Sequence, residues 1–419
     1  QLIIAENKQA FDLANDNLFR LSLYRQHNKS YYFSVTIYHI ISDAWSNYMF
    51  IDEMQSLYAK FAKNENISLP PADSSYEHFV NWETRLINSA RGQAMYKFWQ
   101  NHLPTTIPVL DLPTDKSRPS VITNVGASYQ FDLGKALTEQ LHQFSQQHDA
   151  TPFMVLLATY YALMHKYTHQ DEIIIGSPVA GRTAPEFAKV YGYFVNPLPL
   201  CARFNDEINF DALVKQVKNI TLSALDNQEF PFALLVDRLG IDHDPSRSSV
   251  FQIMFVMLNH RVEKSHMDDN NVAYYKGFPM QFMELPEEEG QFDITLSTYE
   301  ENGVFNATFK YNTDLFEHQS IVQMAEYYRQ LLSHLLASPT KAISKLALLT
   351  SKDITQLYPE TPPVEQNDLL IHQAFELAAQ KYPEQRALSY ATENNLTETI
   401  SYRGLNQHAN QLANIINQE

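Results

Sequence analysis

The chain has 419 residues, of which 44% are hydrophobic and 19% charged, so it can bury a large core and lacks the composition of a disordered protein. Its 11 glycines are too few and too dispersed to form either common Gly-rich phosphate-binding loop. The net charge is −17 and no Lys/Arg-rich run is present, which argues against binding to nucleic acid or to an anionic membrane.

The cysteine and histidine content narrows the chemistry further. The single cysteine, Cys201, cannot support a disulfide framework or a Cys-rich metal site in this chain, and it fits a reducing compartment such as the cytoplasm. The longest largely apolar stretch, residues 153–164, is too short to cross a bilayer. His165 and His169 are four residues apart, but without a third ligand a solvated helix end is the favoured interpretation. We therefore expect neither a bound metal nor a covalently bound cofactor.

The first part of the chain has mixed α/β character. Residues 31–38 are β-branched and aromatic, which predicts a strand with His39 at its end on the apolar face. Apolar residues recur at helical spacing from about residue 44 to 63, and a second helix is predicted over 76–100. Residues 112–119 are polar and contain two prolines, which is typical of a crossing between two halves of a protein.

The second part alternates helices and strands on a larger scale. Residues 250–258 are almost continuously apolar, as expected of a strand buried on both faces. The other expected helices are at 135–148, 152–167, 208–226 and 318–337, and the other expected strands are at 127–132, 172–175, 292–299 and 304–311.

The composition changes near the end of the chain. Residues 357–365 carry three prolines and no helical pattern, which predicts a linker. Residues 370–380 and 402–417 then predict two amphipathic helices around short strands. About fifty residues bury little core by themselves, so we expect the start of a further domain here.

The best candidate for chemistry is the segment 39–46, His-Ile-Ile-Ser-Asp-Ala-Trp-Ser. A histidine at a strand end can take or relay a proton near neutral pH, and Asp43 can fix the local backbone or hold a cation. The residues alone leave two alternatives open, because H-x-x-x-D is frequent by chance. His39 can be a buried structural histidine, and Asp43 can be a helix N-cap.

The surrounding segments favour catalysis. Residues 38–46 resemble the H-H-x-x-x-D-G-W-S motif of condensation domains in nonribosomal peptide synthetases. Residues 400–413 are similar to the opening of an adenylation domain, which usually follows a condensation domain, so the resemblance covers nearly the whole chain. Further segments similar to condensation motifs occur in the family's order at 11–13, 76–82, 176–182, 191–196 with Arg203, 227–232, 244–247 with Phe251, and 311–316.

The resemblance implies an α/β fold with two lobes similar to chloramphenicol acetyltransferase, which form a V with a tunnel between them. The implied divisions are an N-terminal lobe at 1–115, a C-terminal lobe at 116–350, a linker at 351–367, and an incomplete adenylation domain at 368–419. The first lobe is expected to be incomplete at its start, because the family's opening strand, helix and R-H-E-x-L-R-T-x-F segment are absent. The implied partners are donor and acceptor peptidyl carrier proteins, which bring substrates on phosphopantetheine arms, and the adenylation and carrier domains of the same synthetase.

The implied reaction is amide formation, in which the acceptor's amine attacks the donor thioester. The resemblance assigns His39 the role of general base or amine-positioning residue. Asp43 matches a structural aspartate that pairs with an arginine, and we expect Arg247 to be its partner. Asn196 matches a family asparagine, although a turn residue restrained by Pro197 is an equal alternative. The remaining residues matched to the motif or tunnel are Tyr38, Ala44, Trp45 and Ser46.

Several positions depart from the family pattern. Tyr38 replaces the first motif histidine, and Ala44 replaces a glycine, where its methyl group can narrow the approach to His39. His243, Ser248 and Ser249 stand where the family has Arg, Asn and Pro. These departures keep open a degenerate, non-catalytic platform that only docks carrier proteins or partners. A coenzyme A-dependent acyltransferase of the same superfamily also shares H-x-x-x-D, but the adenylation-like tail argues against it.

Overall fold

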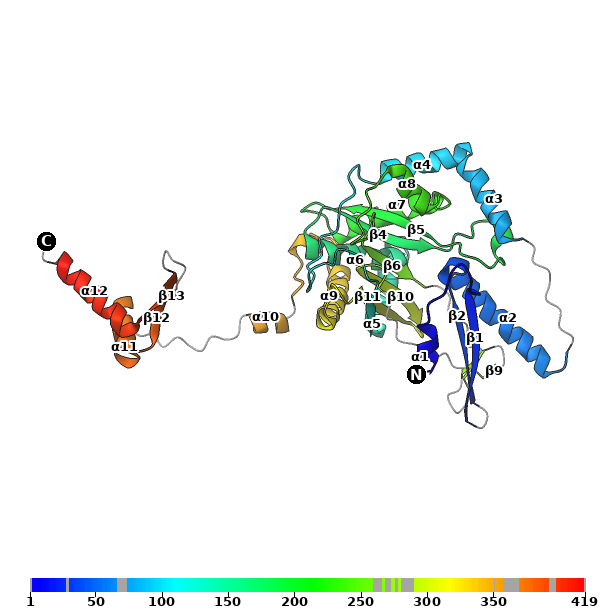
Figure 1. The fold of residues 1–419 in the computed structure, drawn as a ribbon. Coiled ribbons are helices and arrows are strands. Elements are labelled where there is room, and N and C mark those ends of the chain that lie inside the picture. The colour runs from blue at the N-terminus through cyan, green and yellow to red at the C-terminus, as the bar shows by residue number, and fades with distance from the viewer. Residues whose placement is uncertain are drawn as a thin grey trace. The chain divides into compact units, whose positions relative to one another are not determined.

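The computed structural model divides the chain into two compact units, Gln1–Thr350 and Ser351–Glu419 (Figure 1). Among the described residues, no helix is long and apolar enough to cross a membrane. The residues described are 2–27, 30–65, 74–258, 266–267, 273–275, 278–279, 290–349, 351–357, 369–391 and 397–417.

A six-stranded sheet with the order β3-β11-β10-β6-β4-β5 forms the centre of the first unit. The inner strand β6 is parallel to both of its neighbours, whereas the outer pairs are antiparallel. All five strands expected in this part of the chain are confirmed, although the predicted strand at 172–175 continues to residue 179. The strands are β3 (Gly126–Asp132), β4 (Glu172–Val179), β5 (Asn196–Arg203), β6 (Ile253–Met257), β10 (Ile294–Glu301) and β11 (Val304–Asn312).

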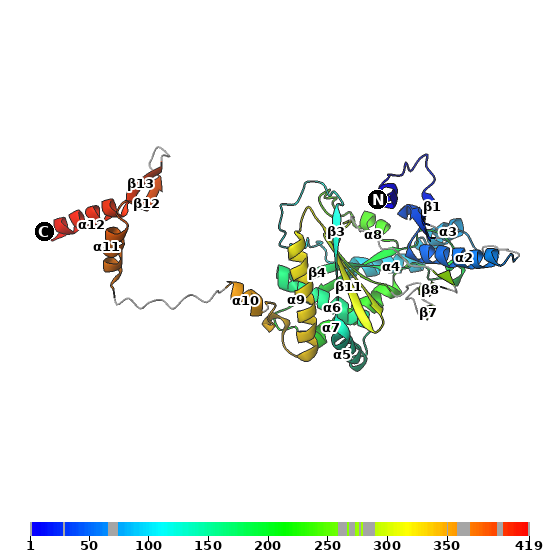
Figure 2. The same cartoon turned by 90° about the horizontal axis from the view of Figure 1, so that it is seen from below.

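Four long helices pack on this sheet and on one another, and all four were expected from periodicity. Figure 2 shows α9 running alongside β3 and β11, which it contacts. Helix α6 is buried at every position from Met154 to Met164, because it lies between the sheet and its helical neighbours. The helices are α5 (Gly134–Gln147), α6 (Pro152–Thr168), α7 (Phe210–Asp226) and α9 (His318–Ala337).

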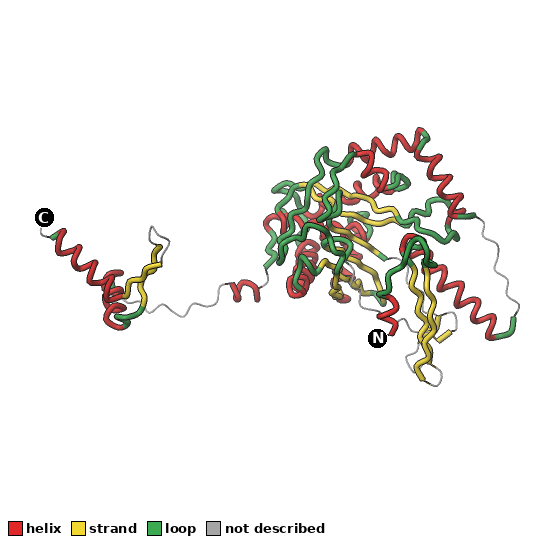
Figure 3. The backbone as a smooth tube through the Cα atoms, in the orientation of Figure 1, coloured by secondary structure: helices red, strands yellow, loops and turns green. Residues whose placement is uncertain are grey.

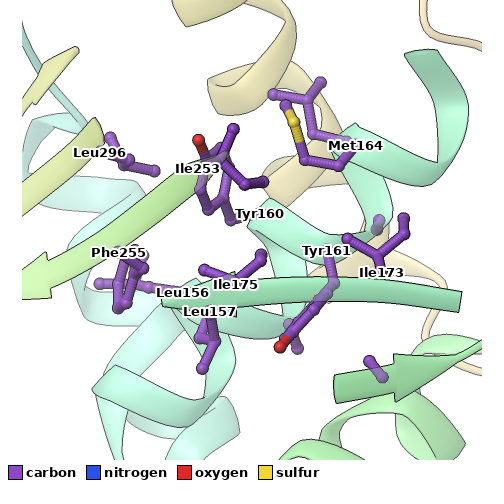
Figure 4. Close-up of a cluster of buried hydrophobic side chains, with 14 of the residues drawn as sticks. Leu156, Leu157, Tyr160, Tyr161, Met164, Ile173, Ile175, Ile253, Phe255 and Leu296 are labelled. Atoms are coloured by element: carbon purple, nitrogen blue, oxygen red, sulfur yellow. The ribbon is translucent and has the colours of Figure 1, made fainter. Parts of the chain in front are cut away.

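The hydrophobic core lies between α6 and the sheet (Figure 4). Tyr160 and Tyr161 of α6 are fully buried there with aliphatic side chains of β4, β6 and β10. The Tyr161 hydroxyl donates to the carbonyl oxygen of Leu200 at 2.6 Å. Full burial of these large side chains makes the contact between α6 and the sheet a major source of stability for the first unit.

The N-terminal part contains a separate antiparallel hairpin of β1 (Phe19–His27) and β2 (Ser30–Ile37) (Figure 3). The strand expected at 31–38 is confirmed, but it ends at Ile37, and His39 begins a short 3₁₀ turn, His39–Ile41. The helix expected at 44–63 is α2 (Ala44–Ala62). A short helix, α1 (Leu2–Asn7), precedes the hairpin.

The single helix predicted at 76–100 is two helices, α3 (Tyr76–Ile87) and α4 (Ala90–His102). Ser89 caps α4 by accepting a hydrogen bond from the N–H of Gly92 at 3.2 Å, so a new helix starts where the apolar pattern continues without a break. Gly92 is required at this corner, because a Cβ there would lie 2.4 Å from the carbonyl oxygens of Leu86 and Ile87.

Several elements of the first unit were not predicted, among them α1, β1, β5 and α8 (Phe232–Leu239). Strand β5 contains Pro197 and Pro199, which obscure its pattern, and it tolerates them because it is an edge strand. Helix α8 is short and contacts β5 and α4. The smaller described elements are the turns at Pro185–Phe187 and Ile343–Lys345 and the three-stranded sheet of β7 (His266–Met267), β8 (Ala273–Tyr275) and β9 (Phe278–Pro279).

The second unit contains α10 (Ser351–Leu357), α11 (Ile371–Lys381), β12 (Arg386–Ala391), β13 (Thr397–Ser401) and α12 (Tyr402–Ile416). The two helices predicted here are confirmed. The predicted linker at 351–367 begins with helix α10, and its remainder, 358–367, lies outside the described residues. Residues 1–350 form one unit by contacts, so the lobe boundary at 115 stays a prediction.

Candidate active site

His39 lies at the surface between β2 and α2, where the 3₁₀ turn presents its imidazole. Its Nδ1 lies 2.7 Å from the carbonyl oxygen of Ser42. A carbonyl can only accept, so in the neutral ring Nδ1 carries the proton and Nε2 carries the lone pair. The ring also meets the ring of Tyr193, with centroids 5.2 Å apart and planes at 75°. His39 therefore presents a basic nitrogen rather than the buried ring of a structural histidine.

Asp43 is the N-cap of α2 and is also one half of a buried ion pair. Its Oδ1 accepts from the N–H of Ser46 at 2.8 Å, which confirms the capping alternative. Its Oδ2 accepts from Nη1 of Arg182 at 2.6 Å and from the N–H of Phe194 at 3.1 Å. The side chains of Asp43 and Arg182 are only 1% and 3% exposed. Both carboxylate oxygens are thus satisfied within the protein.

The expected Asp43–Arg247 pair is wrong. Arg247 pairs instead with Asp244, three residues earlier, at 2.8 Å between Nε and Oδ2. Arg182 reaches Asp43 because the chain turns sharply at Gly181, where φ is +68° and a Cβ would lie 1.8 Å from the carbonyl oxygen of Phe194. Only glycine fits this left-handed position against a neighbouring backbone.

The electrostatics of the site keep Asp43 ionised. Burial by itself would raise the pKa of this carboxyl, but the hydrogen bond and charge of Arg182 and the N–H groups of Ser46 and Phe194 hold its pKa below the usual value. The guanidinium also lies over the Phe194 ring, with Cζ 4.0 Å from the centroid. The site therefore holds a fixed charge pair beside His39 rather than a second titrating group.

The segment 184–195 is tied to the start of α2 by the motif side chains. Trp45 Nε1 donates to the carbonyl of Ala188 at 3.0 Å. The Ser46 hydroxyl donates to the carbonyl of Gly192 at 3.0 Å and accepts from its N–H at 3.2 Å. Trp45 and Ser46 thus hold the segment 184–195 against the start of α2, close to His39 in the sequence.

Asn196 is more than a turn residue. Its Nδ2 donates to the carbonyls of Gln228 and Phe230, both at 2.8 Å, and its Oδ1 accepts from the N–H of Phe232 at 2.8 Å. It therefore fixes the segment that leads into α8. The two departures from the motif lie at the surface: the ring of Tyr38 contacts Phe11, with centroids 5.8 Å apart, and Ala44 is the exposed first residue of α2.

Other reaction classes receive little support from the described residues. Within these ranges no cluster of three His, Cys, Asp or Glu residues could hold a metal ion. His165 stacks on Phe204 and hydrogen-bonds to the carbonyl of Gln170 through Nδ1, a role in the packing of the helix end. Burial raises the pKa of the Cys201 thiol to about 11, which makes it a poor nucleophile. Among the described residues, His39 remains the candidate for proton transfer at this site.

Comparison with known proteins decides the family. The family model described as "Condensation domain" matches residues 1–358. The chain belongs to the condensation domain family. Condensation domains of nonribosomal peptide synthetases are acyltransferases that form amide bonds, and this chain is of that type.

The relatives of this condensation domain are much larger proteins, and it matches a small part of each. The chain is 33% identical over 415 residues to tyrocidine synthase 3 of Brevibacillus parabrevis, a match that covers 98% of the chain and 6% of the relative. It is 31% identical over 421 residues to gramicidin S synthase 2 of Aneurinibacillus migulanus, covering 100% of the chain and 9% of the relative. The chain thus spans a small fraction of these curated relatives.

Solved structures show the same mixed α/β fold. A crystal structure of a holo four-domain nonribosomal peptide synthetase bound to AMP and glycine matches with a TM-score of 0.78 and 23% identity, covering 100% of this chain and 32% of that one. The X-domain from teicoplanin biosynthesis matches with a TM-score of 0.73 and 20% identity, covering 82% of this chain and 78% of that one.

Two residues of the condensation domain site were not assigned a role from the sequence. Arg182 lies in a segment that resembles a family motif. Its sequence signal was the glycine before it, because Gly181 follows a strand and a glycine there is typical of a sharp turn that can direct the next side chain toward the site. Tyr193 carried no such signal, because an aromatic residue within 191–196 does not show which ring it meets.

Proposed function

We propose that this chain joins a carrier-bound donor to a carrier-bound acceptor, with His39 as the general base. The observation that supports this most directly is the Nδ1–Ser42 hydrogen bond, which leaves the lone pair on Nε2. Tethering supplies high effective concentration, so the remaining demands are proton transfer and stabilisation of the tetrahedral intermediate.

The proposed reaction needs one base. The acceptor's neutral amine attacks the thioester carbonyl, and its proton passes to His39 Nε2 as the tetrahedral intermediate forms. The intermediate collapses by breaking the carbon–sulfur bond, and the imidazolium returns the proton to the departing phosphopantetheine thiolate. The product is an amide and a free carrier thiol, and His39 ends in its starting state.

The test is single-turnover condensation by the full-length synthetase with loaded donor and acceptor carriers. His39→Ala should lower the rate by about 10²–10⁴-fold, the usual contribution of a positioned general base. His142→Ala is the matched control, because the side chain of His142 is 39% exposed, pairs with Glu300 and lies outside the site, so its loss should leave the rate unchanged. Equal rates for wild type and His39→Ala would reject the proposal.

The docking-platform alternative makes a different prediction. A platform would bind both carriers and yield no amide even in the wild-type protein. Family membership and the intact His39 favour the enzyme.

We further propose that the first unit has the two-lobed, V-shaped fold with a tunnel and that its N-terminal lobe continues into a preceding segment. The hairpin β1–β2 supports this, because Phe19, Leu23 and Tyr31 are 50%, 65% and 55% exposed. An apolar sheet face of this kind is usually covered in a complete domain. A chain extended by the preceding residues of its gene should show lower exposure of this face, read as weaker binding of an apolar dye.

We also propose that residues 368–419 begin an adenylation domain. The condensation match ends at 358, whereas the similarity to the four-domain synthetase covers the whole chain. Helix α12 has no buried residue and exposes Leu412, Ile415 and Ile416, as expected of an element whose packing partners lie elsewhere. The proposed partners are the carrier and adenylation domains of the same synthetase. The proposed location is the cytoplasm, with which a single, buried and unpaired cysteine, Cys201, is consistent.

A further inference from the structure

His39 and Tyr193 share an aromatic contact at the surface of the first unit. Their ring centroids are 5.2 Å apart and the ring planes lie at 75°, an edge-to-face arrangement. Contacts of this geometry are favourable for aromatic rings and restrict how each ring rotates. The imidazole is therefore held by two restraints, the ring of Tyr193 and the Nδ1 bond to the Ser42 carbonyl.

Hydrogen bonds fix the backbone at Tyr193 and at the residues directly before and after it. Its own carbonyl accepts from the Tyr76 hydroxyl at 2.7 Å. The preceding Gly192 is bonded through both its N–H and its carbonyl to the Ser46 hydroxyl, at 3.2 and 3.0 Å. The N–H of the following Phe194 donates to the carboxylate of the buried ion pair at 3.1 Å. The position of the Tyr193 ring is thus set by the same groups that build the start of α2.

The side chains of this segment alternate between interior and surface. Gly192 and Phe194 are buried, whereas Tyr191 and Tyr193 are 41% and 37% exposed. The two exposed tyrosines differ in their contacts, because the Tyr191 hydroxyl donates to Glu53 Oε2 at 2.9 Å. The Tyr193 hydroxyl makes no hydrogen bond to another residue that the structure describes. The contact between Tyr193 and His39 is made by their rings and does not need the hydroxyl.

We propose that Tyr193 is a positioning residue for the condensation reaction, whose ring holds the His39 imidazole with Nε2 directed to the acceptor amine. This inference rests on the proposed function, since it gives Tyr193 a role only through His39. Without the ring of Tyr193, only the hydrogen bond from Nδ1 to the Ser42 carbonyl opposes rotation of the imidazole about Cβ–Cγ. The base then spends less time in the productive orientation. Misplacement of a catalytic group by about 1 Å can cost up to 10²-fold in rate.

The experiment measures single-turnover condensation by the full-length synthetase at varied concentration of the loaded acceptor carrier. Tyr193→Ala should lower the limiting rate about tenfold and leave the half-saturating carrier concentration unchanged, because positioning of the base acts after binding. Tyr193→Phe keeps the ring and should restore the rate to within about twofold of wild type. Tyr191→Ala is the matched control, a similarly exposed tyrosine two residues away whose loss should leave the limiting rate within about twofold.

A double-mutant cycle separates this proposal from the role of His39. If Tyr193 acts through His39, Tyr193→Ala should cause no further loss in a His39→Ala protein. The same tenfold loss in both backgrounds would overturn the positioning role and leave the assignment of His39 intact. A loss in Tyr193→Phe equal to that in Tyr193→Ala would also overturn it, because the hydroxyl would then be responsible. A His39→Ala protein as fast as wild type would reject the proposed function and this inference together.

Discussion

Arg182 and Asp43 form a buried ion pair, Nη1 to Oδ2 at 2.6 Å, although 139 residues separate them in sequence. The pair joins the turn after β4 to the first residue before α2, and Arg182 adds a second bond from Nη2 to the Ser46 hydroxyl at 2.8 Å. The pair thus holds the histidine motif against the segment that directly follows β4 of the six-stranded sheet. His39 lies four residues before Asp43, so this pair anchors the chain directly after the turn that carries the imidazole.

Removal of either charge should destabilise the first unit strongly. Arg182→Met leaves the carboxylate of Asp43 buried without its counter-ion, and breaking a buried pair in this way costs about 3–5 kcal/mol. Urea unfolding followed by tryptophan fluorescence measures the loss. Arg247→Met is the control, because Arg247 pairs with its sequence neighbour Asp244 near the surface and should have little effect. Equal stability of the two variants would contradict the assignment of the partner.

The ion pair also predicts how stability depends on pH. The pKa of Asp43 is lowered in the folded protein, so its contribution is present above the unfolded-state pKa of about 3.9 and is lost as the pH falls through the lower folded value. Asp43→Asn should therefore be less stable than wild type at pH 7. The difference in unfolding free energy should stay constant down to about pH 5 and shrink below about pH 4. A difference that is unchanged at pH 3 would show that the charge of Asp43 is not what stabilises the fold.

The sequence predicted most elements of the fold because their patterns are local. Helix α2, the four long helices that pack on the sheet and most strands of the sheet follow from spacing alone. Strand β5 was missed because two prolines interrupt it, a disruption that only its place at the sheet edge explains. The break between α3 and α4 was missed because the apolar pattern runs through it.

The partner of Asp43 could not be found from spacing or motif order. Arg182 and Arg247 both stand in segments that resemble family motifs, and the fold brings Arg182 to Asp43 and leaves Arg247 with Asp244. The contact of Tyr193 with His39 is likewise a product of the tertiary fold, because the two residues belong to segments far apart in the sequence. Local patterns identify candidate residues, and long-range packing decides which of them meet.

Asn196 should stabilise the segment 228–232 through its three side-chain hydrogen bonds. Asn196→Ala removes the partner of two carbonyls and one N–H in the segment 228–232, and a buried polar group left unsatisfied costs about 1–3 kcal/mol. We expect a loss of stability of about 3 kcal/mol and faster proteolysis within this segment. Gln228→Ala is the control, since its exposed amide donates to the nearby Leu225 carbonyl. Unchanged proteolysis in Asn196→Ala would argue for the simple turn residue.

Gly192 should be intolerant of any side chain because of Tyr76. A Cβ at Gly192 would lie 2.2 Å from Cδ2 of the Tyr76 ring, so Gly192→Ala must push the ring away and weaken its hydroxyl bond to the Tyr193 carbonyl. Because that bond helps to hold Tyr193 against His39, the condensation rate should fall about tenfold or more. Single-turnover condensation by the full-length synthetase measures this effect.

The steric origin of this loss can be separated from other effects of alanine. Tyr76→Ala removes the ring and creates the space that the new methyl group needs, so adding Gly192→Ala to it should cost much less than in the wild-type background. The two substitutions should therefore be strongly non-additive, since each disturbs the same contact. Additive losses would show that the effect of Gly192→Ala comes from the backbone of residue 192 and not from a clash with the Tyr76 ring. The displaced Tyr76 ring would then not be the cause of the lower condensation rate.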